Sequence, residues 1–461
     1  MSTVTDAVIA ANRFGLGAKP GELAALGSSA RDALLAQLQQ PVPLPAATLK
    51  PSWQVVTEVG QARRARREAG KGADVVAAAL NLGQLLRPVY VDECVARLQV
   101  AVGTDVSFVE RLVQFWSNHF AVSIDKQPVL GLAGAMEREA IRPHVLGNFT
   151  QMLLAVERHP AMLLYLDNAQ STGPQSLAAQ VQQRRGAQRV LGLNENLGRE
   201  ILELHTLGVS GGYQQQDVTT LAAMITGWSV DAGDVATPGE QGGRFLFRPA
   251  LHEPGPKTLL GKVYVQEGVQ QGEQALRDLA LHPQTARHLA TKLVRHLVAD
   301  EPPAALVQQV AAAYLQADGD LPSTYRALLS HREAWEPSPR KFKTPADYLY
   351  STWRALGITP PATAASLAPF EQLGQRMFQP GSPAGWPDGS ADWDGSSALL
   401  KRLELAHVAA QRYSAGRDVL ALAESSVGST LDATTRSAIA RAQDRVQAMT
   451  LWLSSPPFMR R

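Results

Sequence analysis

Apolar residues recur at helical spacing along most of this 461-residue chain and rarely alternate with a period of two. Because a helix repeats every 3.6 residues and a strand every two, this pattern predicts a mainly α protein. We expect helices at residues 22–39, 74–84, 88–100, 105–120, 131–142, 146–156, 194–208, 215–227, 271–280, 284–298, 304–316, 322–330, 344–356, 397–414 and 431–453. Thr104, Asp217 and Asp432 are candidate N-caps, and Pro283 and Pro303 stand where helices begin.

Residues 243–264, GRFLFRPALHEPGPKTLLGKVY, depart from this pattern. Two short β-rich runs flank the turn-forming string HEPGP, which predicts a β-hairpin or a pair of short strands. The expected architecture is therefore a large, bundle-like helical fold with one small β-hairpin insertion.

We expect a single intertwined helical domain over residues 1–461, interrupted by three exposed connections. Residues 41–72 are rich in Pro and Arg, residues 168–190 are rich in Gln, Ser and Arg, and residues 379–396 are rich in Gly and Pro. The basic cluster from Arg63 to Lys71 could hold phosphate or an acidic partner. A solvated helix face is the favoured interpretation, because this is one short basic run in a balanced chain.

The composition excludes several classes of protein. A single cysteine, Cys94, rules out a disulfide framework and a metal site built from several thiolates. A net charge of +2 offers no global field for nucleic acid or for an anionic membrane. No run of about eighteen apolar residues predicts a transmembrane helix. The first twenty residues lack the features of a secretory signal, so we expect a soluble cytoplasmic protein, with periplasmic placement by co-export as the alternative.

The segment at residues 194–208 carries the most informative charges. On a helix, Asn196, Glu200 and Glu203 share one narrow stripe, and the rest of the surface is apolar enough to predict burial. Neither glutamate has a basic residue four positions later, whereas Glu195 has Arg199. Buried like charges need a cation, a shared proton or distant arginines.

Two interpretations of this stripe stay open. In the first, Glu200 and Glu203 are metal ligands or an acid–base pair, with Asn196 as a further oxygen ligand or as a residue that orients them. In the second, both glutamates anchor a buried salt-bridge network. Its partners would be arginines of other helices, namely Arg111, Arg138 or Arg142.

The histidines differ in what their surroundings predict. His119 lies among Phe115, Trp116 and Phe120, where a core histidine is the favoured interpretation. His252 belongs to the HEPGP turn, and loop histidines are more often functional. His205 lies about 200° around the helix from Glu203, so the two are not expected to share a site. Because HExxH is absent, any metal site would have to be discontinuous.

These segments resemble the bacterial family known as domain of unknown function eighteen hundred. The likeness rests on GLNENLGREILELHTLGVSGGY with its continuation to TGW at residues 192–228, and on ANRFGLGA, FWSNHFAVS, IRPHVLGNF, RHPAMLLYLDNAQS, LHEPGPKTLLG, LHPQTARHLATKL, DEPP, FKTPADYL and GWPDG. It implies a predominantly helical single-chain fold. It also implies a partner protein encoded nearby. The family often occurs beside a second uncharacterised family that resembles exported sulfatases and alkaline phosphatases. Many members begin with an export signal, and this sequence departs from that pattern.

Together these observations favour an enzyme whose polar pocket forms where residues 115–123, 194–205 and 245–257 converge. Its expected catalytic residues are Glu200, Glu203, His119 and His252. Its expected binding residues are Asn194, Asn196, Arg111, His205 and Trp386, the last at the rim. Its expected metal ligands are Glu200, Glu203 and His252. Metal-assisted hydrolysis with a divalent ion is the first expectation, and oxidation with a bound metal is another. The alternative is a non-catalytic partner or maturation factor for the sulfatase-like protein.

Overall fold

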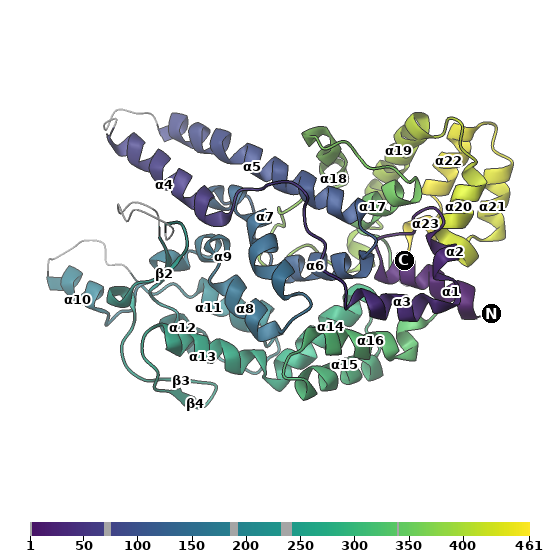
Figure 1. The fold of residues 1–461 in the computed structure, drawn as a ribbon. Coiled ribbons are helices and arrows are strands. Elements are labelled where there is room, and N and C mark those ends of the chain that lie inside the picture. The colour runs from purple at the N-terminus through teal and green to yellow at the C-terminus, as the bar shows by residue number, and fades with distance from the viewer. Residues whose placement is uncertain (1, 69–74, 185–191, 232–241, 339–340) are drawn as a thin grey trace.

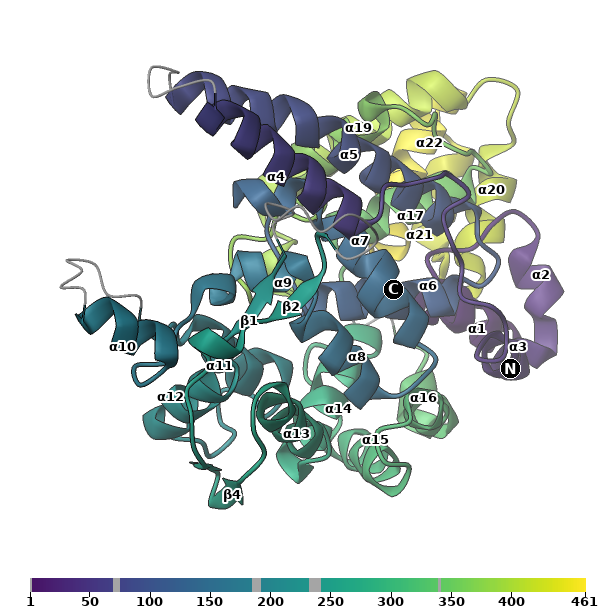
Figure 2. The ribbon, with the colours of Figure 1, turned by 60° about the vertical axis from the view of Figure 1, so that its left-hand side comes forward.

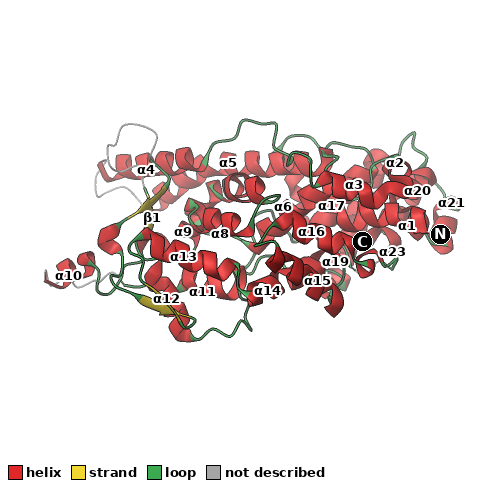
Figure 3. Ribbon diagram, turned by 60° about the horizontal axis from the view of Figure 1, so that its bottom comes forward, coloured by secondary structure: helices red, strands yellow, loops and turns green. Residues whose placement is uncertain are grey.

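The computed structural model describes residues 2–68, 75–184, 192–231, 242–338 and 341–461. Its helices form one elongated body (Figures 1 and 3). The two termini lie at one end, with α1 (Ser2–Ile9) and α23 (Pro456–Met459), and the strands lie near the other. A continuous cluster of buried apolar side chains includes members from Ala7 to Met459.

The helices of the first half range in length from four residues in α7 to 29 in α5. They are α2 (Glu22–Leu26), α3 (Ala30–Gln37), α4 (Ser52–Glu68), α5 (Val75–Gly103), α6 (Ser107–His119), α7 (Ala133–Met136), α8 (Phe149–Glu157), α9 (Pro160–Tyr165), α10 (Leu177–Arg184), α11 (Asn196–Glu200) and α12 (Gln215–Met224). Helix α6 lies inside this half, and ten of its thirteen residues are buried. Because most of α6 is inaccessible to solvent, its polar side chains must meet partners or a cavity.

The second half begins with α13, after which α14, α15 and α16 pack against one another in succession, and it ends in a bundle beside the N-terminus. Its helices are α13 (Val269–Ala280), α14 (Pro283–Leu297), α15 (Ala304–Gln316), α16 (Leu321–Ser330), α17 (Pro345–Ala355), α18 (Ala368–Gln372), α19 (Ser396–Tyr413), α20 (Val419–Val427), α21 (Ala433–Ala440) and α22 (Arg445–Leu453). Several begin at a capping side chain followed by proline. His282 accepts a hydrogen bond from Gln284 N before Pro283 opens α14, and Thr344 caps α17 before Pro345.

Four short strands form two separate antiparallel pairs (Figure 2). Strand β1 (Trp228–Val230) pairs with β2 (Phe245–Phe247), and β3 (Lys257–Leu259) pairs with β4 (Lys262–Tyr264). The predicted mainly α fold with a small β insertion at residues 243–264 is confirmed. The first half of that insertion pairs with β1, which the sequence pattern did not predict.

Two of the predicted connections contain helices. Helix α4 occupies much of residues 41–72, because Val55, Val56 and Val59 place a buried apolar face among the polar residues. Helix α10 lies inside residues 168–190, with Ala179 buried. The stretch at 379–396 contains one short 3₁₀ turn, Ser390–Asp392, before α19 begins at Ser396.

Several helix ends also differ from expectation. The predicted helices 74–84 and 88–100 join as α5, which accommodates Pro88 in its interior. The predicted helix 431–453 is divided into α21 and α22, because Asp444 caps a new start. Asp432 is an N-cap as predicted, whereas Asp217 occupies the third position of a capping box whose N-cap is Gln214.

Within the described ranges, no helix is both long enough and apolar enough to cross a membrane. The cellular compartment and the division into domains stay predictions.

Candidate functional site

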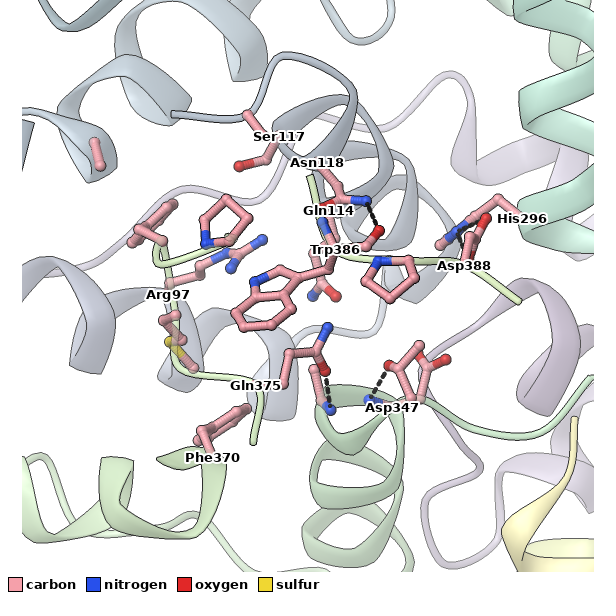
Figure 4. A pocket seen from close by; sticks show the side chains of 18 of the residues that line it. Arg97, Gln114, Ser117, Asn118, His296, Asp347, Phe370, Gln375, Trp386 and Asp388 are labelled. Atoms are coloured by element: carbon pink, nitrogen blue, oxygen red, sulfur yellow. Dashed lines mark hydrogen bonds and ion pairs between the residues drawn. The ribbon is translucent and has the colours of Figure 1, made fainter. Parts of the chain in front are cut away.

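A polar pocket lies between α5, α6, α14 and α17 and is closed by the stretch that leads from α18 to Asp388 (Figure 4). The cavity measures about 90 Å³. Its polar wall comprises Arg97, Arg111, Gln114, Ser117, Asn118, His296, Asp347, Gln375 and Asp388, and Trp386, Phe370 and Phe378 supply aromatic surface. We call this cavity the polar pocket.

Helix α6 supplies the floor of the pocket because of its residue spacing. Arg111, Gln114 and Asn118 follow one another at three and four positions, so they lie on the same helix face. Asn118 holds the facing backbone at two points. Its Nδ2 donates to Trp386 O at 2.9 Å, and its Oδ1 accepts from Trp386 N at 2.7 Å. Asn118 thus fixes Trp386 across the pocket.

Gly385 permits this close approach. Its φ is +83°, and a Cβ at this position would lie 2.4 Å from Asn118 O. A side chain would therefore meet both an unfavourable backbone conformation and rigid backbone of α6. The turn that carries Trp386 and Asp388 docks on α6 because residue 385 is glycine.

His296 and Asp388 form the pair of greatest chemical interest in the wall. His296 Nδ1 lies 3.0 Å from Asp388 Oδ1 and 3.2 Å from Oδ2. With Nδ1–H donating to the carboxylate, His296 Nε2 retains its lone pair, and it has no hydrogen-bond partner within the described residues. The pair therefore presents an oriented imidazole with one uncommitted nitrogen.

The ionisation of this pair is set by burial and by the charges around it. Burial lowers the pKa of His296 below its usual 6.5, although Asp388 opposes the shift. Burial alone would raise the pKa of Asp388, but His296 and Lys341 beside it lower the value to about 2. At neutral pH the pair is consequently a neutral imidazole beside a carboxylate.

Asp347 holds a second buried ionic cluster at the edge of the pocket. Its Oδ1 lies 2.9 Å from Arg111 Nη1, and its Oδ2 lies 2.9 Å from Arg461 Nε. Burial opposes ionisation, but the two guanidinium groups hold the pKa of Asp347 far below its usual range. Arg111 also donates from Nε to Gly15 O at 2.7 Å, which ties α6 to the N-terminal segment.

Arg97 brings a cation to the opposite wall. Its Nε lies 2.9 Å from Glu137 Oε2, and its guanidinium lies 4.9 Å from the centroid of the Phe378 ring. Glu137 also pairs with Arg142, which pairs with Glu110. The terminal nitrogens of Arg97 make no hydrogen bond to any residue that the structure describes, and Figure 4 shows the guanidinium directed toward the middle of the pocket.

The family model for Protein of unknown function (DUF1800) matches residues 9–460. This chain belongs to the DUF1800 family. It matches no curated protein and no solved structure.

Three of the strings that carry the DUF1800 resemblance converge on the polar pocket. FWSNHFAVS contributes Ser117 and Asn118, FKTPADYL contributes Asp347, and GWPDG contributes Trp386 and Asp388. These strings are far apart in the sequence, so only the folded chain brings them together.

Two of the predicted binding residues, Arg111 and Trp386, line the polar pocket of this DUF1800 chain. His119 and His205 lie together elsewhere, with His119 Nε2 3.2 Å from His205 O. His205 Nδ1 is 2.7 Å from Glu157 Oε1, and these side chains are fully buried. The predicted convergence of residues 115–123 with 194–205 therefore occurs around a buried histidine pair.

The predicted carboxylate stripe is less buried than expected. Glu200 and Glu203 are only partly buried, because α11 ends at Glu200 and the chain continues as a π-helical turn over Ile201–His205 that turns His205 inward instead. Burial raises the pKa of Glu200, and Glu203 adds to this effect against the opposing influence of His205.

The predicted arginine partners of Glu200 and Glu203 are engaged by other carboxylates. Arg111 pairs with Asp347, Arg138 with Glu93, and Arg142 with Glu110 and Glu137. The predicted salt-bridge network around Glu200 and Glu203 is therefore wrong in its partners, whereas the predicted Glu195–Arg199 pair forms at 3.1 Å. Long-range pairing of this kind cannot be inferred from spacing along one helix.

His252 and the two asparagines make local contacts. His252 Nδ1 lies 3.0 Å from Thr226 O. Asn194 Oδ1 accepts from Asn196 N at 2.9 Å, which opens α11, and Asn196 itself is exposed. Among the described residues no three His, Cys, Asp or Glu side chains are arranged to hold a metal ion, so Glu200, Glu203 and His252 do not form the predicted ligand set.

Sequence reasoning did not single out His296, Asp388 or Asp347. Two of them stood inside quoted strings, GWPDG and FKTPADYL, and acidic residues within such strings were the available signal. The string GVSGG at residues 208–212 also fits the GxSxG pattern of serine hydrolases. Its Ser210 is exposed and follows a helix rather than a strand, so it lacks the strand–turn–helix setting of a nucleophile elbow.

Proposed function

We propose that this protein is an enzyme that performs general-base hydrolysis of a small polar substrate in the polar pocket. The observation that supports this proposal is the His296–Asp388 pair, with Nδ1 3.0 Å from the carboxylate and Nε2 uncommitted. A carboxylate that orients an imidazole and fixes its tautomer leaves the other nitrogen to accept a proton. The low pKa of His296 keeps it in the basic form at neutral pH.

In this mechanism His296 takes the proton of an attacking water molecule at Nε2, and Asp388 stabilises the imidazolium that results. Nε2 is buried, with the Phe115 ring centroid 5.3 Å from that of the imidazole. Substrate and water must therefore displace the side chains that now cover it. Trp386 is partly exposed and Pro387 is exposed, so this side of the pocket is the route of entry.

Arg97 has the role of holding negative charge on the substrate. A guanidinium with free terminal nitrogens in a partly desolvated wall binds an oxyanion by charge-assisted hydrogen bonds. Gln114 contributes a buried Nε2 that has no partner within the described residues. A cavity of about 90 Å³ accommodates only the reacting end of such a substrate or a molecule of a few heavy atoms.

The test is hydrolysis of a panel of chromogenic esters, amides, phosphate esters and sulfate esters by the wild-type protein and by His296→Asn and Asp388→Asn. The matched control is His407→Asn, because His407 is an exposed helix residue outside the polar pocket whose imidazole contacts Gln411. We expect at least one class to be hydrolysed, and both pocket variants to lose that activity while the control retains it. Wild-type turnover in folded His296→Asn protein would contradict the proposal.

A further inference from the structure

A second cavity, of about 390 Å³, lies apart from the polar pocket, between α4, α9 and β1. Its inner wall is aliphatic. Val55, Val56 and Val59 project from one face of α4, Leu164 comes from α9, and Val230 comes from β1. We call it the valine cavity.

The size and lining of the valine cavity are those of a ligand site. Small-molecule sites commonly measure about 300–1,000 Å³ and have mainly apolar walls with a few polar groups. All three α4 valines are at least nine-tenths buried, and so is Val230. Binding would therefore transfer an aliphatic chain of several carbons from water to a preformed apolar wall, which is favourable.

The rim of the valine cavity carries positive charge. Arg63 on α4 and Arg248 after β2 both line it, and none of its described lining residues is acidic. Arg248 is held at the rim by its Nε, which donates to Ser229 Oγ at 3.2 Å, while Ser229 Oγ donates to Ala169 O at 2.8 Å. Neither arginine is paired with a carboxylate within the described ranges.

A cavity with an apolar wall beneath two arginines favours a ligand that is apolar at one end and anionic at the other. A neutral hydrocarbon would leave the two exposed guanidinium groups bound to water rather than to the ligand, and a small inorganic anion would leave the valines in contact with water. A chain that ends in a carboxylate satisfies both surfaces, because guanidinium binds carboxylate in a bidentate manner.

We propose that the valine cavity binds a soluble medium-chain aliphatic carboxylate, with its chain against the α4 valines and its head at Arg63 and Arg248. The basic cluster that begins at Arg63 thereby acquires a ligand-binding role at its first residue, which is exposed. This site is independent of the hydrolysis proposed for the polar pocket.

The experiment is isothermal titration calorimetry of the full chain with sodium decanoate below its micellar concentration. We expect one molecule to bind per chain, and decanol and butyrate to bind at least about 10-fold more weakly, because each lacks one of the two interactions. Arg63→Gln and Arg248→Gln should each weaken decanoate binding by about 10-fold. Arg244→Gln, which changes an exposed arginine near the same strand but outside the lining, should bind like the wild type.

Val59→Phe should fill the cavity and abolish binding, with circular dichroism to verify the fold. Because Val59 is buried, the exposed arginine variants carry the test if Val59→Phe does not fold. The proposal is overturned if decanoate gives no binding, if butyrate binds as well as decanoate, or if both arginine variants bind like the wild type. Association with anionic lipid vesicles without binding of monomeric decanoate would also overturn it.

Discussion

Asp388 Oδ1 lies 3.0 Å from His296 Nδ1, although 92 positions separate the two residues in the chain. His296 stands in the last turn of α14, and Asp388 belongs to a turn that α6 holds through Asn118. Three segments must therefore be in place before the imidazole is oriented.

Replacing Asp388 with asparagine should remove the charge that orients His296 without changing the shape of the side chain. Turnover should fall by about 100-fold or more, the usual contribution of general-base catalysis. The pKa of His296, measured by NMR titration, should fall further, because Asp388 is the group that raises it. An unchanged His296 pKa in Asp388→Asn would show that the pair does not form in solution.

The pH dependence of turnover should follow the protonation of His296. Activity requires the neutral imidazole, and burial places the pKa below 6.5. The rate should therefore be constant through neutral pH and decline only below 6.5 as the pH falls. A rate that declines already between pH 8 and 7 would assign the base to another group.

Gly385→Ala should displace the turn that carries Trp386 and Asp388. Its Cβ would lie 2.4 Å from Asn118 O, and φ is +83°. We expect a loss of about 1–3 kcal/mol in the free energy of unfolding and a red shift of Trp386 fluorescence. Gly374→Ala is the matched control, because Gly374 has the same φ of +83° but nothing within 4 Å of an added Cβ. If both variants behave alike, the contact with α6 does not position the turn.

Asp347→Asn should destabilise the protein at neutral pH by about 3–5 kcal/mol, because it leaves Arg111 and Arg461 buried without their carboxylate. The folded-state pKa of Asp347 lies below its unfolded value, so its contribution is complete above the unfolded value. It is lost as the pH falls through the folded-state value. In urea unfolding, the difference between the variant and the wild type should thus shrink as the pH falls below 3.8. A difference that does not depend on pH would contradict this assignment.

Glu200→Gln should increase stability slightly at neutral pH, by less than about 1 kcal/mol. Burial raises the pKa of Glu200, so the folded protein favours its neutral form, and the advantage should vanish once acid protonates the wild-type residue. Glu157→Ala should instead cost about 3 kcal/mol, because Glu157 is fully buried against His205. Turnover of the hydrolase substrate by Glu200→Gln should equal that of the wild type. A large loss of turnover would restore Glu200 as a catalytic residue.

Much of the helical architecture could be predicted because its signals are local. Asp432 caps α21 and Pro283 opens α14, and each signal lies within a few residues of the element that it starts. Helix α4 was missed because a Pro-rich start and a run of arginines outweighed its three valines. The π-helical turn over Ile201–His205 was also missed, because the spacing of apolar residues does not distinguish it from an α-helix.

The candidate site was only partly predictable. Trp386 and Arg111 line the polar pocket, but no residue of 194–205 or 245–257 does, and the lining side chains are separated by up to 291 positions, from Arg97 to Asp388. A single sequence contains no signal for such pairings. The prediction of a site at Glu200 and Glu203 requires a straight, buried helix. In the structure, α11 ends at Glu200.

The most direct test of the central claim is the steady-state turnover of His296→Asn compared with wild-type protein, on whichever chromogenic substrate the wild type hydrolyses. Both proteins should show the same thermal unfolding midpoint within a few degrees. We predict a loss of about 10²–10⁴-fold in kcat for the variant, as expected when a general base is removed. Equal kcat values in two equally folded proteins would contradict the assignment of His296 as the catalytic base.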